Sequence, residues 1–397
     1  MSRTKTRTRA NPPMRIAILT NDNRERYKDY NHPTPYFGPA PEALLQGFRM
    51  LGKEVEVHVI SCLQQPAPAP EKIGDNMWFH AVHVPKAGWL RTLYQGCIRA
   101  TRKKLREIRP DIVHGQGTER DCALCAIYSG FPNVLTIHGN MRSVAKYNPN
   151  FFHTITGKLE AFVLKRTAGV FCNSAYTEGL VARLAKRIWR VPNALRRPFF
   201  EQPVEPRKTK PPVILNIGVI FPYKRQLEIL DVARNLHRRG FKFEMHFIGS
   251  MESPLKYCAD FRREIAEAEK EGYARHVEEM NIHELIRALD AATAMIHFPS
   301  EEAFGLVAAE ALARNLKLFA SSHGGVGDIA AGTEGAEVIP GDDWAGLENS
   351  VARWLEAGSP LPKTAAQTMR ERYSPEVIAR KHVEIYRSLL NQNPSSS

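Results

Sequence analysis

Short apolar segments alternate with longer amphipathic segments along the first half of the chain. Residues 15–20 (RIAILT) form an apolar run, apolar residues recur with helical spacing over 42–51, and residues 54–61 (EVEVHVIS) alternate in polarity as a strand does. Further strands are expected at 77–84, 111–114, 133–138, 169–173 and 188–191. Helical patterns lie between most of these strands, so the sequence predicts an α/β, Rossmann-like domain.

The second half repeats this rhythm after a segment without apolar periodicity. Residues 198–212 are rich in proline and charge, which is typical of a linker. Strands are then expected at 213–219, 243–248, 292–298, 317–321 and 337–339, with helices after Lys224, over 255–271 and over 375–390. Ligands of such sheets bind beyond the carboxyl ends of the strands, so two facing sheets predict a site in the cleft between them.

Length and composition agree with two soluble domains. A chain of 397 residues is too long for one typical core, and 43% apolar with 24% charged residues is ordinary for a globular protein. No apolar run approaches the roughly 20 residues that span a membrane, and the N-terminus lacks a hydrophobic signal core. The sequence therefore predicts a cytoplasmic protein.

The net charge of +13 narrows the classes of partner to nucleic acid, anionic lipid or a polyanionic substrate. No nucleic-acid module accompanies the charge, so nucleic acid is not expected. Part of the excess lies in residues 1–13, which hold basic residues and no acid and form either a solubility tail or a contact with an anionic membrane surface. Basic clusters at 99–109 and 183–197 leave open a peripheral position at the inner face of the membrane.

The six cysteines are sparse and show no pattern of a secreted scaffold, so we expect them to be reduced. Cys122 and Cys125 form a C-x-x-C, but the surrounding residues have a helical pattern and no second pair completes a zinc site. We interpret the pair as part of the core, with redox or metal function as the alternative. No metal site is predicted.

The most informative segment is 299–312 (PSEEAFGLVAAEAL). An apolar strand is expected just before it, and the apolar residues after Gly305 predict a helix that begins near Phe304 or Gly305. The first N–H groups of such a helix are free and favour an anion such as a phosphate at the carboxyl end of the strand. The segment therefore predicts a ligand-binding turn.

Glu302 and Glu310 flank this turn eight residues apart. The spacing corresponds to roughly 12 Å if the span is helical. That is too long for the two carboxylates of a retaining glycosidase, which lie roughly 5 Å apart, while an inverting arrangement stays open. A sugar nucleotide fits the spacing better, with one carboxylate on the sugar, the helix start on the phosphates and the other carboxylate on the ribose.

These residues resemble the retaining glycosyltransferases of family 4, whose Glu-x7-Glu signature corresponds to Glu302 and Glu310. Companion motifs occur in the same order over most of the chain, at 136–139 (TIHG), 172–174 (CNS), 191–193 (VPN), 218–224 (GVIFPYK), 246–249 (HFIG) and 323–329 (HGGVGDI). A lone Glu-x7-Glu is a weak signal, but the strand, the Phe-Gly turn and the ordered companions make it specific. The resemblance implies an α/β, GT-B fold, in which two Rossmann-like domains face each other across a cleft.

The implied organisation has four parts. A basic disordered tail covers 1–13, an N-terminal acceptor domain covers 14–198, a nucleotide-sugar domain covers 199–372, and a helix in 373–392 packs back on the first domain. Three positions depart from the family pattern. Val219 replaces the arginine that often follows Gly218, Asp328 replaces a glutamate, and the first loop holds the single glycine Gly38.

The implied activity is transfer of a hexosyl unit from a nucleoside-diphosphate sugar to an acceptor hydroxyl, with retention at the anomeric carbon. The resemblance implies no cofactor and no metal, a glycan or lipid-linked acceptor, and a place in cell-surface glycan or glycolipid synthesis. Val219 and the single glycine Gly38 keep open a sugar-nucleotide-binding protein that has lost transfer activity. A non-hydrolysing sugar-nucleotide epimerase is also GT-B-shaped. A nicotinamide oxidoreductase is disfavoured because no G-x-G-x-x-G follows residues 15–20.

The resemblance assigns roles to individual residues. The expected catalytic residues are His138, in contact with the transferred sugar, Glu302, on its hydroxyls, and Lys224, on the departing diphosphate. The expected donor-binding residues are Gly38, Gly218, Lys224, Arg225, Ala303, Phe304, Gly305, Leu306, Glu310, Gly324 and Gly325. Acceptor contacts are expected from Arg24, Arg26, His32 and Arg142.

Structural alternatives remain for several of these positions. Lys224 is otherwise a surface lysine, His138 a core histidine, and Gly38 or the Gly324-Gly325 pair an ordinary turn. Asn173 and Ser174 are expected to cap a helix that begins near Ala175. Glu301 is expected to be solvated, because Glu302 is the residue in register with Glu310.

Overall fold

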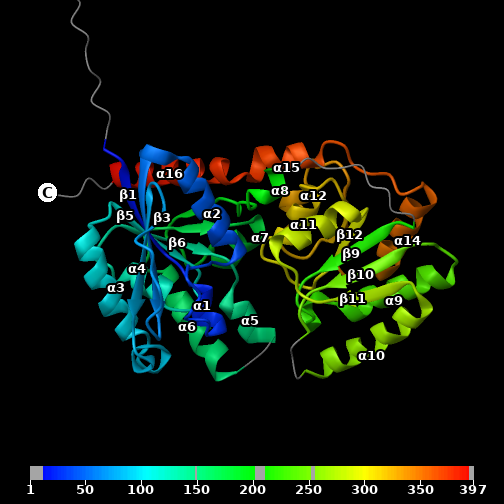
Figure 1. Cartoon of the computed structure of the whole chain (residues 1–397), viewed down its shortest axis with the longest axis horizontal. Helices are drawn as coiled ribbons and strands as arrows, with labels where there is room; N and C mark the ends of the chain where they lie inside the picture. Colours follow the sequence, from blue (N-terminus) through cyan, green and yellow to red (C-terminus); the bar gives the residue numbers. More distant parts are fainter. Residues whose placement is uncertain (1–11, 148–149, 202–210, 252–254, 393–397) are drawn as a thin grey trace, which may run out of the picture.

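The computed structural model describes residues 12–147, 150–201, 211–251 and 255–392 (Figure 1). Most of the expected tail at 1–13 and the middle of the expected linker at 198–212 lie outside these residues. The described chain forms two α/β units, each built on one sheet, which stand side by side in Figure 1. Sequence reasoning expected this two-sheet arrangement, and the structure confirms it.

The first sheet has the strand order β3-β4-β2-β1-β5-β6-β7-β8, and all neighbours are parallel except β3 and β4. Its strands are β1 (Met14–Leu19), β2 (Val55–Leu63), β3 (Lys72–Gly74), β4 (Met77–His83), β5 (Ile112–Gln116), β6 (Asn133–Ile137), β7 (Val170–Cys172) and β8 (Ile188–Arg190). The helices of this unit are α1 (Asn23–Tyr27), α2 (Pro39–Met50), α3 (Gln95–Ile108), α4 (Cys122–Ile127), α5 (Met141–Tyr147), α6 (Phe151–Leu164) and α7 (Ala175–Val181). Short 3₁₀ segments lie at Gly52–Glu54, Lys86–Gly88 and Leu90–Thr92.

The second sheet has the order β11-β10-β9-β12-β13-β14 and is parallel throughout its described pairs. Its strands are β9 (Val213–Ile217), β10 (Glu244–Ile248), β11 (Ala274–Val277), β12 (Ala294–His297), β13 (Lys317–Ser321) and β14 (Ala336–Ile339). The remaining helices are α8 (Pro198–Glu201), α9 (Gln226–Arg238), α10 (Lys256–Glu271), α11 (Ile282–Ala291), α12 (Leu306–Leu312), α13 (Val326–Ala330), α14 (Trp344–Glu356), α15 (Ala365–Tyr373) and α16 (Pro375–Gln392), with a 3₁₀ turn at Pro222–Lys224. Buried apolar clusters cover both faces of the sheet, which explains why its strands are almost continuously apolar.

The C-terminal helix crosses back to the first unit, as expected. In α15, Met369 and Tyr373 belong to a core of the second unit, whereas in α16 Val383 and Tyr386 belong to the core of the first unit. Figure 1 shows α16 lying along the first unit beside α2, and the two helices are in direct contact. The chain therefore ties the two units together at its C-terminal end.

The contact between α2 and α16 leaves no room for a side chain at Gly47. A Cβ built at Gly47 would lie 2.1 Å from the Pro375 carbonyl oxygen and 2.8 Å from the Ala379 Cβ. We therefore expect Gly47→Ala to lower the free energy of unfolding by about 1–3 kcal/mol, although alanine is the better helix former. Denaturant unfolding measures the change.

The matched control is Gly179→Ala, because Gly179 lies in α7 and an added Cβ meets no atom within 4 Å. This variant is expected to gain up to about 1 kcal/mol of stability. Equal stability changes for the two variants would contradict the close contact between α2 and α16.

Among the described residues, no helix combines the length and the apolar character that a bilayer crossing needs.

Candidate active site

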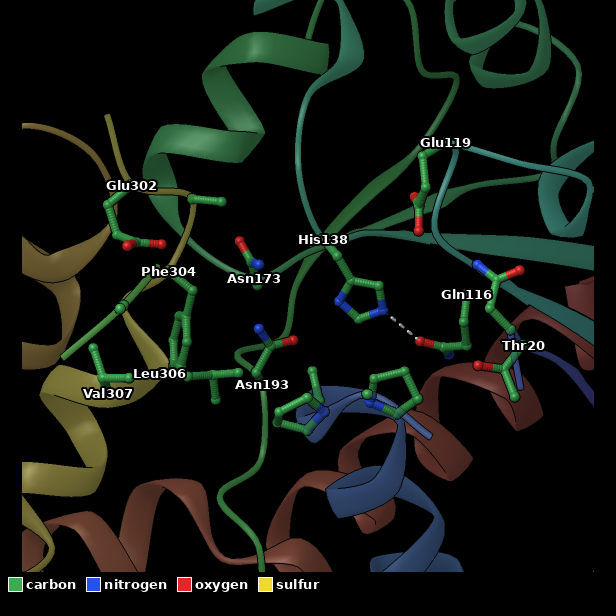
Figure 2. Close-up of a pocket in the computed structure, with 18 of the residues that line it drawn as sticks. Thr20, Gln116, Glu119, His138, Asn173, Asn193, Glu302, Phe304, Leu306 and Val307 are labelled. Carbon is green, nitrogen blue, oxygen red and sulfur yellow. Dashed lines mark hydrogen bonds between the residues drawn. The ribbon is translucent and has the colours of Figure 1, made fainter. Parts of the chain in front are cut away.

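A cavity of about 580 Å³ lies between the two sheets, and most of its wall lies at or just after the carboxyl end of a strand or at the start of a helix. The first unit contributes Thr20, Asn21, Asn23, Arg26, Gly38, Pro39, Ala40, Pro41, Gln116, Glu119, Arg120, His138, Asn173 and Asn193. The second unit contributes Ile217, Gly218, Lys224, Glu302, Ala303, Phe304, Gly305, Leu306 and Val307. Figure 2 shows the two groups on opposite sides of the cavity, with Glu302 facing the side of His138 and Gln116.

The wall of the second unit holds a half-buried ion pair. Lys224 Nζ lies 2.8 Å from Glu302 Oε2, and His297 Nε2 lies 3.1 Å from the same oxygen. Burial acts to raise the pKa of Glu302, but the Lys224 charge and the His297 hydrogen bond outweigh it, so this pKa lies below its usual range. Burial acts to lower the pKa of Lys224, and the Glu302 charge outweighs it, so that pKa is raised. Both side chains are therefore charged at neutral pH.

The turn between Glu302 and α12 depends on Gly305. Its φ of 95° lies in the left-handed region, and it forms the N-cap of α12, which begins at Leu306. The sequence placed this helix start at Phe304 or Gly305, one or two residues too early. The first N–H groups of a helix have no carbonyl partner inside it, and Leu306 and Val307 line the cavity at this point.

His138 follows β6 and presents one free nitrogen to the cavity. Its Nε2 lies 2.9 Å from Gln116 Oε1, drawn as the dashed line in Figure 2, whereas its buried Nδ1 has no partner in the part of the chain that the structure describes. Burial lowers the pKa of His138 to about 4, so the ring is neutral at physiological pH. A neutral ring that donates from Nε2 has an acceptor at Nδ1, which is suited to a ligand hydroxyl.

A chain of hydrogen bonds behind His138 leads to the C-terminal helix. Gln116 Nε2 lies 3.2 Å from His114 Nε2, and His114 Nδ1 lies 2.5 Å from the Tyr386 hydroxyl of α16. Burial lowers the pKa of His114 well below its usual range, so this ring is neutral as well. The helix that crosses between the units thus supports the residue that orients His138.

Glu310 does not line the cavity. It lies in α12, is 4% exposed, and its carboxylate is 3.4 Å from Arg196 Nη2. Burial raises the pKa of Glu310 to about 7, and Arg196 only partly offsets the effect. The expected contact of this carboxylate with a ribose stays a prediction, because Glu310 is not among the residues that line the cavity.

The raised pKa of Glu310 makes stability depend on pH. The folded chain binds the proton more tightly than the unfolded chain, so stability falls as pH rises from the unfolded value near 4.5 through about 7. The free energy of unfolding changes by about 1.4 kcal/mol per pH unit, so the wild type is expected to lose roughly 3 kcal/mol across this window relative to Glu310→Gln. Unfolding of both proteins between pH 5 and pH 8 measures it. Wild-type stability that rises with pH relative to the variant would contradict this burial.

Three residues that are expected to contact the donor do not line the cavity, and their donor contacts stay predictions. Arg225 points away from the cavity, where its Nη2 lies 2.7 Å from Asp342 Oδ1 and its Nη1 lies 2.7 Å from the Gly341 carbonyl oxygen. Gly324 and Gly325 permit close backbone contact, because a Cβ built on them would lie 2.0 Å from the Glu302 carbonyl oxygen and 2.3 Å from the Ala303 carbonyl oxygen. These glycines support the turn from behind and do not line the cavity.

Of the four expected acceptor contacts, only Arg26 lines the cavity. Arg24 is fully buried, with its guanidinium 2.7 Å from Asp22 Oδ2. Arg142 lies 3.3 Å from Glu160, and His32 Nδ1 lies 2.7 Å from the Thr34 carbonyl oxygen. Gly38 lines the cavity at the start of α2, and an added Cβ would meet only Pro41 Cδ at 3.9 Å, so its open side faces free space.

Ser174 caps α7 as expected, because its hydroxyl accepts from the Thr177 N–H in a capping box. Asn173 is not the cap, and its Oδ1 accepts a hydrogen bond from the Thr177 hydroxyl. It lines the cavity, and its buried Nδ2 has no partner among the described residues. Glu301, expected to be solvated, is half-buried and accepts a hydrogen bond of 3.0 Å from the Tyr176 hydroxyl across the two units.

Sequence reasoning missed most of the polar residues of the first unit that line the cavity, namely Thr20, Asn21, Asn23, Gln116, Glu119, Arg120 and Asn193. Their common signal is a position just after an expected strand, which marks the binding edge of a parallel sheet. Glu119 is the acid among them, and burial raises its pKa. This side of the cavity is therefore polar and offers both donors and acceptors.

Two family models match the chain. Glycosyltransferase Family 4 matches residues 42–196, and Glycosyl transferases group 1 matches residues 199–372. No curated protein matches the chain in sequence.

Solved structures share its fold. Sucrose-phosphate synthase from Thermosynechococcus elongatus aligns with a TM-score of 0.73 at 16% identity, covering 96% of this chain and all of the other (100%). Anabaena HepE in complex with UDP and glucose aligns with a TM-score of 0.68 at 14% identity, covering 94% of this chain and 100% of HepE. The lipopolysaccharide outer core galactosyltransferase WaaB in its apo form aligns with a TM-score of 0.68 at 15% identity, covering 94% and 100%. At these identities the likeness shows a common fold.

Proposed function

Since the chain belongs to the family 4-like glycosyltransferases of GT-B fold, we propose that it moves a hexosyl unit from a nucleoside-diphosphate sugar to an acceptor hydroxyl, with retention at the anomeric carbon. The observation that carries the proposal is the ion pair between Lys224 and Glu302, which lies in the inter-domain cavity beside the start of α12. A cation, a carboxylate and free amides at one point suit a ligand that has both phosphate and hydroxyl groups.

A nucleotide-sugar donor is supported by the cavity and by one structural neighbour. The cavity of about 580 Å³ lies in the usual range for small-molecule sites. The HepE structure contains UDP and glucose, which supports the same class of donor here. In our proposal the diphosphate lies against Lys224 and the amides of Leu306 and Val307, and the sugar extends toward His138.

Lys224 and the amides at the start of α12 would stabilise the charge that develops on the departing diphosphate. Such preorganised donors act in a water-poor site and cost little reorganisation during the reaction. When the donor binds, its phosphate competes with Glu302 for Lys224, and the carboxylate becomes free to accept hydrogen bonds from the sugar. This positioning requires no metal at the reacting centre, so chelator treatment is expected to leave transfer unchanged.

Retention would follow from attack on the face that the diphosphate leaves. The bond from the anomeric carbon to the diphosphate oxygen breaks, the acceptor oxygen bonds to the same face, and its proton passes to the departing phosphate oxygen. Glu302 is held by Lys224 and His297, so it is not placed as a free nucleophile. The unpartnered Nδ1 of His138 and Nδ2 of Asn173 are available for sugar hydroxyls.

The acceptor half of the cavity belongs to the first unit, where Arg26, Glu119 and Arg120 carry charge. We propose that these residues, and not Arg24, His32 or Arg142, contact the acceptor. A glycan or lipid-linked acceptor of a cell-surface pathway fits a basic protein. Helix α3 exposes Arg99, Arg102, Lys103 and Arg106, which supports transient contact with anionic lipid. Co-sedimentation with vesicles with and without anionic lipid tests this contact.

The function is tested by a thermal-shift screen with UDP-, GDP- and ADP-sugars, followed by release of nucleoside diphosphate with and without acceptor extracts. One nucleotide class is expected to raise the melting temperature, and the extract is expected to accelerate release. The Glu310→Ala variant enters the same screen, and an unchanged response would count against the ribose role.

A second candidate function is a sugar-nucleotide-binding protein without transfer activity. Val219 favours this second function, because the family often has an arginine at this position and the exposed valine side chain carries no charge. A thermal shift without acceptor-dependent release would support this alternative. An epimerase would instead convert the donor without any acceptor.

A further inference from the structure

Four of the six cysteines gather in one buried core of the first unit, and none of the four lines the cavity. Cys62 is the second-to-last residue of β2, Cys97 lies in α3, and Cys122 and Cys125 lie in α4. The other two cysteines belong to different clusters. Three separate elements thus bring their thiols together at the end of β2.

The closest groups in this cluster have the spacing of a metal site. Cys62 Sγ, Cys125 Sγ and a carboxylate oxygen of Asp121 all lie within 4.8 Å of one another, and all three residues are buried. Cys97 belongs to the same buried core cluster, where its Sγ donates to the Gly88 carbonyl oxygen at 3.9 Å, and it would turn toward the other three groups to supply a fourth ligand. In a tetrahedral zinc site with bonds of about 2.3 Å, neighbouring sulfurs lie about 3.8 Å apart. Small rotations of these side chains would therefore suffice to close the site.

Packing of an apolar core does not explain why the carboxylate of Asp121 is buried there. It is 4% exposed and sits at the N-cap of α4, yet its side chain makes no capping hydrogen bond. Its carboxylate receives a hydrogen bond from the Cys125 thiol at 4.0 Å, which is long even for sulfur, and the Cys62 thiol lies within 4.8 Å. A buried carboxylate is costly without a charged or strongly bonded partner, and a divalent cation would supply one.

We propose that Cys62, Cys97, Asp121 and Cys125 bind a structural divalent metal ion of the zinc type. Thiolates with one carboxylate match the ligand preference of zinc, and full enclosure matches a closed, four-coordinate site. The ion enters as the domain folds, each thiol releases its proton to solvent on binding, and the ion ties β2, α3 and α4 together. From the sequence, metal function was only an alternative for the Cys122 and Cys125 pair, because the fold brings Cys62 and Cys97 to this pair from distant positions.

The proposed ion is not part of the transfer chemistry, yet it lies behind the cavity wall. Arg120 precedes Asp121 and lines the cavity, and Cys122 Sγ lies 3.8 Å from Oδ1 of Asn21, another residue of the wall. The ion would therefore fix the loop after β5 from behind. Because the site is closed, a chelator is expected to remove the ion only from the unfolded chain.

Metal analysis of the untagged, full-length chain, purified under reducing conditions from zinc-supplemented cells, tests the proposal. The wild type is expected to carry about one zinc ion per chain. Cys62→Ser and Cys125→Ser are expected to lose most of it. The matched controls Cys172→Ser and Cys258→Ser replace buried cysteines outside the cluster and are expected to keep it.

If the serine variants do not fold, refolding of the wild type provides a second test of the metal site. Zinc present during refolding is expected to raise the melting temperature relative to refolding with chelator, whereas magnesium is expected to have no effect. Refolding with cobalt is expected to give a thiolate-to-cobalt absorption band. A wild-type protein that carries no zinc and shows no thiolate-to-cobalt band would overturn the proposal. A zinc content in Cys62→Ser and Cys125→Ser equal to that of the wild type would also overturn it, as would a disulfide among these cysteines.

Discussion

Replacement of Lys224 by alanine is expected to lower kcat/KM for sugar transfer by about 10²- to 10³-fold, the usual cost of removing one preorganised donor to developing charge. Lys224 is the cation of the cavity closest to Glu302, at 2.8 Å, and it lies beside the start of α12. Its loss removes charge from the departing diphosphate and leaves Glu302 half-buried without its counterion. Release of nucleoside diphosphate at saturating acceptor measures the effect.

Arg225→Ala is the matched control, because the neighbouring cation pairs with Asp342 and the Gly341 carbonyl outside the cavity. Its kcat/KM is expected to stay within a few-fold of the wild type. Melting temperatures of both variants separate a catalytic loss from unfolding. A Lys224→Ala variant with the wild-type rate, or an equal loss in Arg225→Ala, would remove Lys224 from the reaction.

The second large effect is expected for Glu302→Gln, which keeps the shape of the side chain and removes its charge. Hydrogen bonds to a charged acceptor are worth about 1.5–3 kcal/mol, so kcat/KM is expected to fall by roughly 10²-fold. The variant also leaves Lys224 without its partner in the unliganded state. Since the pKa of Glu302 lies below its usual range, its ionisation should not limit activity anywhere near neutral pH.

Glu301→Gln is the matched control one residue away. Glu301 accepts a hydrogen bond from Tyr176, which a glutamine oxygen can also accept, and it does not line the cavity. Its activity is expected to remain within a few-fold of the wild type. If both variants lose activity equally, the effect belongs to the contact between the two units and not to the sugar site.

Much of the fold follows from local pattern. The buried parallel strands are short apolar runs, so β1, β5, β6 and β12 were predictable within two residues or so. The edge strands β3 and β11 were missed, because half-exposed edge strands have weak patterns. Helix α2 begins at Pro39, before its expected start, since proline is favoured in the first turn of a helix.

The site residues that follow strands of one sheet were predictable from the sequence. The contacts between the two units were not. Glu302, Gly305 and Lys224 come together because their turns follow neighbouring strands of one sheet. The surroundings of Glu310 depend on Arg196 from the other side of the linker, which no local pattern reveals. The ion pair of Arg225 with Asp342 is likewise not visible in a local pattern, because the two residues lie far apart along the chain.

The account depends most on where the phosphate groups of the donor bind. A crystal structure of the chain with the nucleotide sugar that gives the largest thermal shift tests this directly. We predict the diphosphate within hydrogen-bonding distance of Lys224 Nζ and the Leu306 amide, and the sugar between Glu302 and His138. A nucleotide sugar bound outside the inter-domain cavity, or with its diphosphate away from Lys224, would contradict the account.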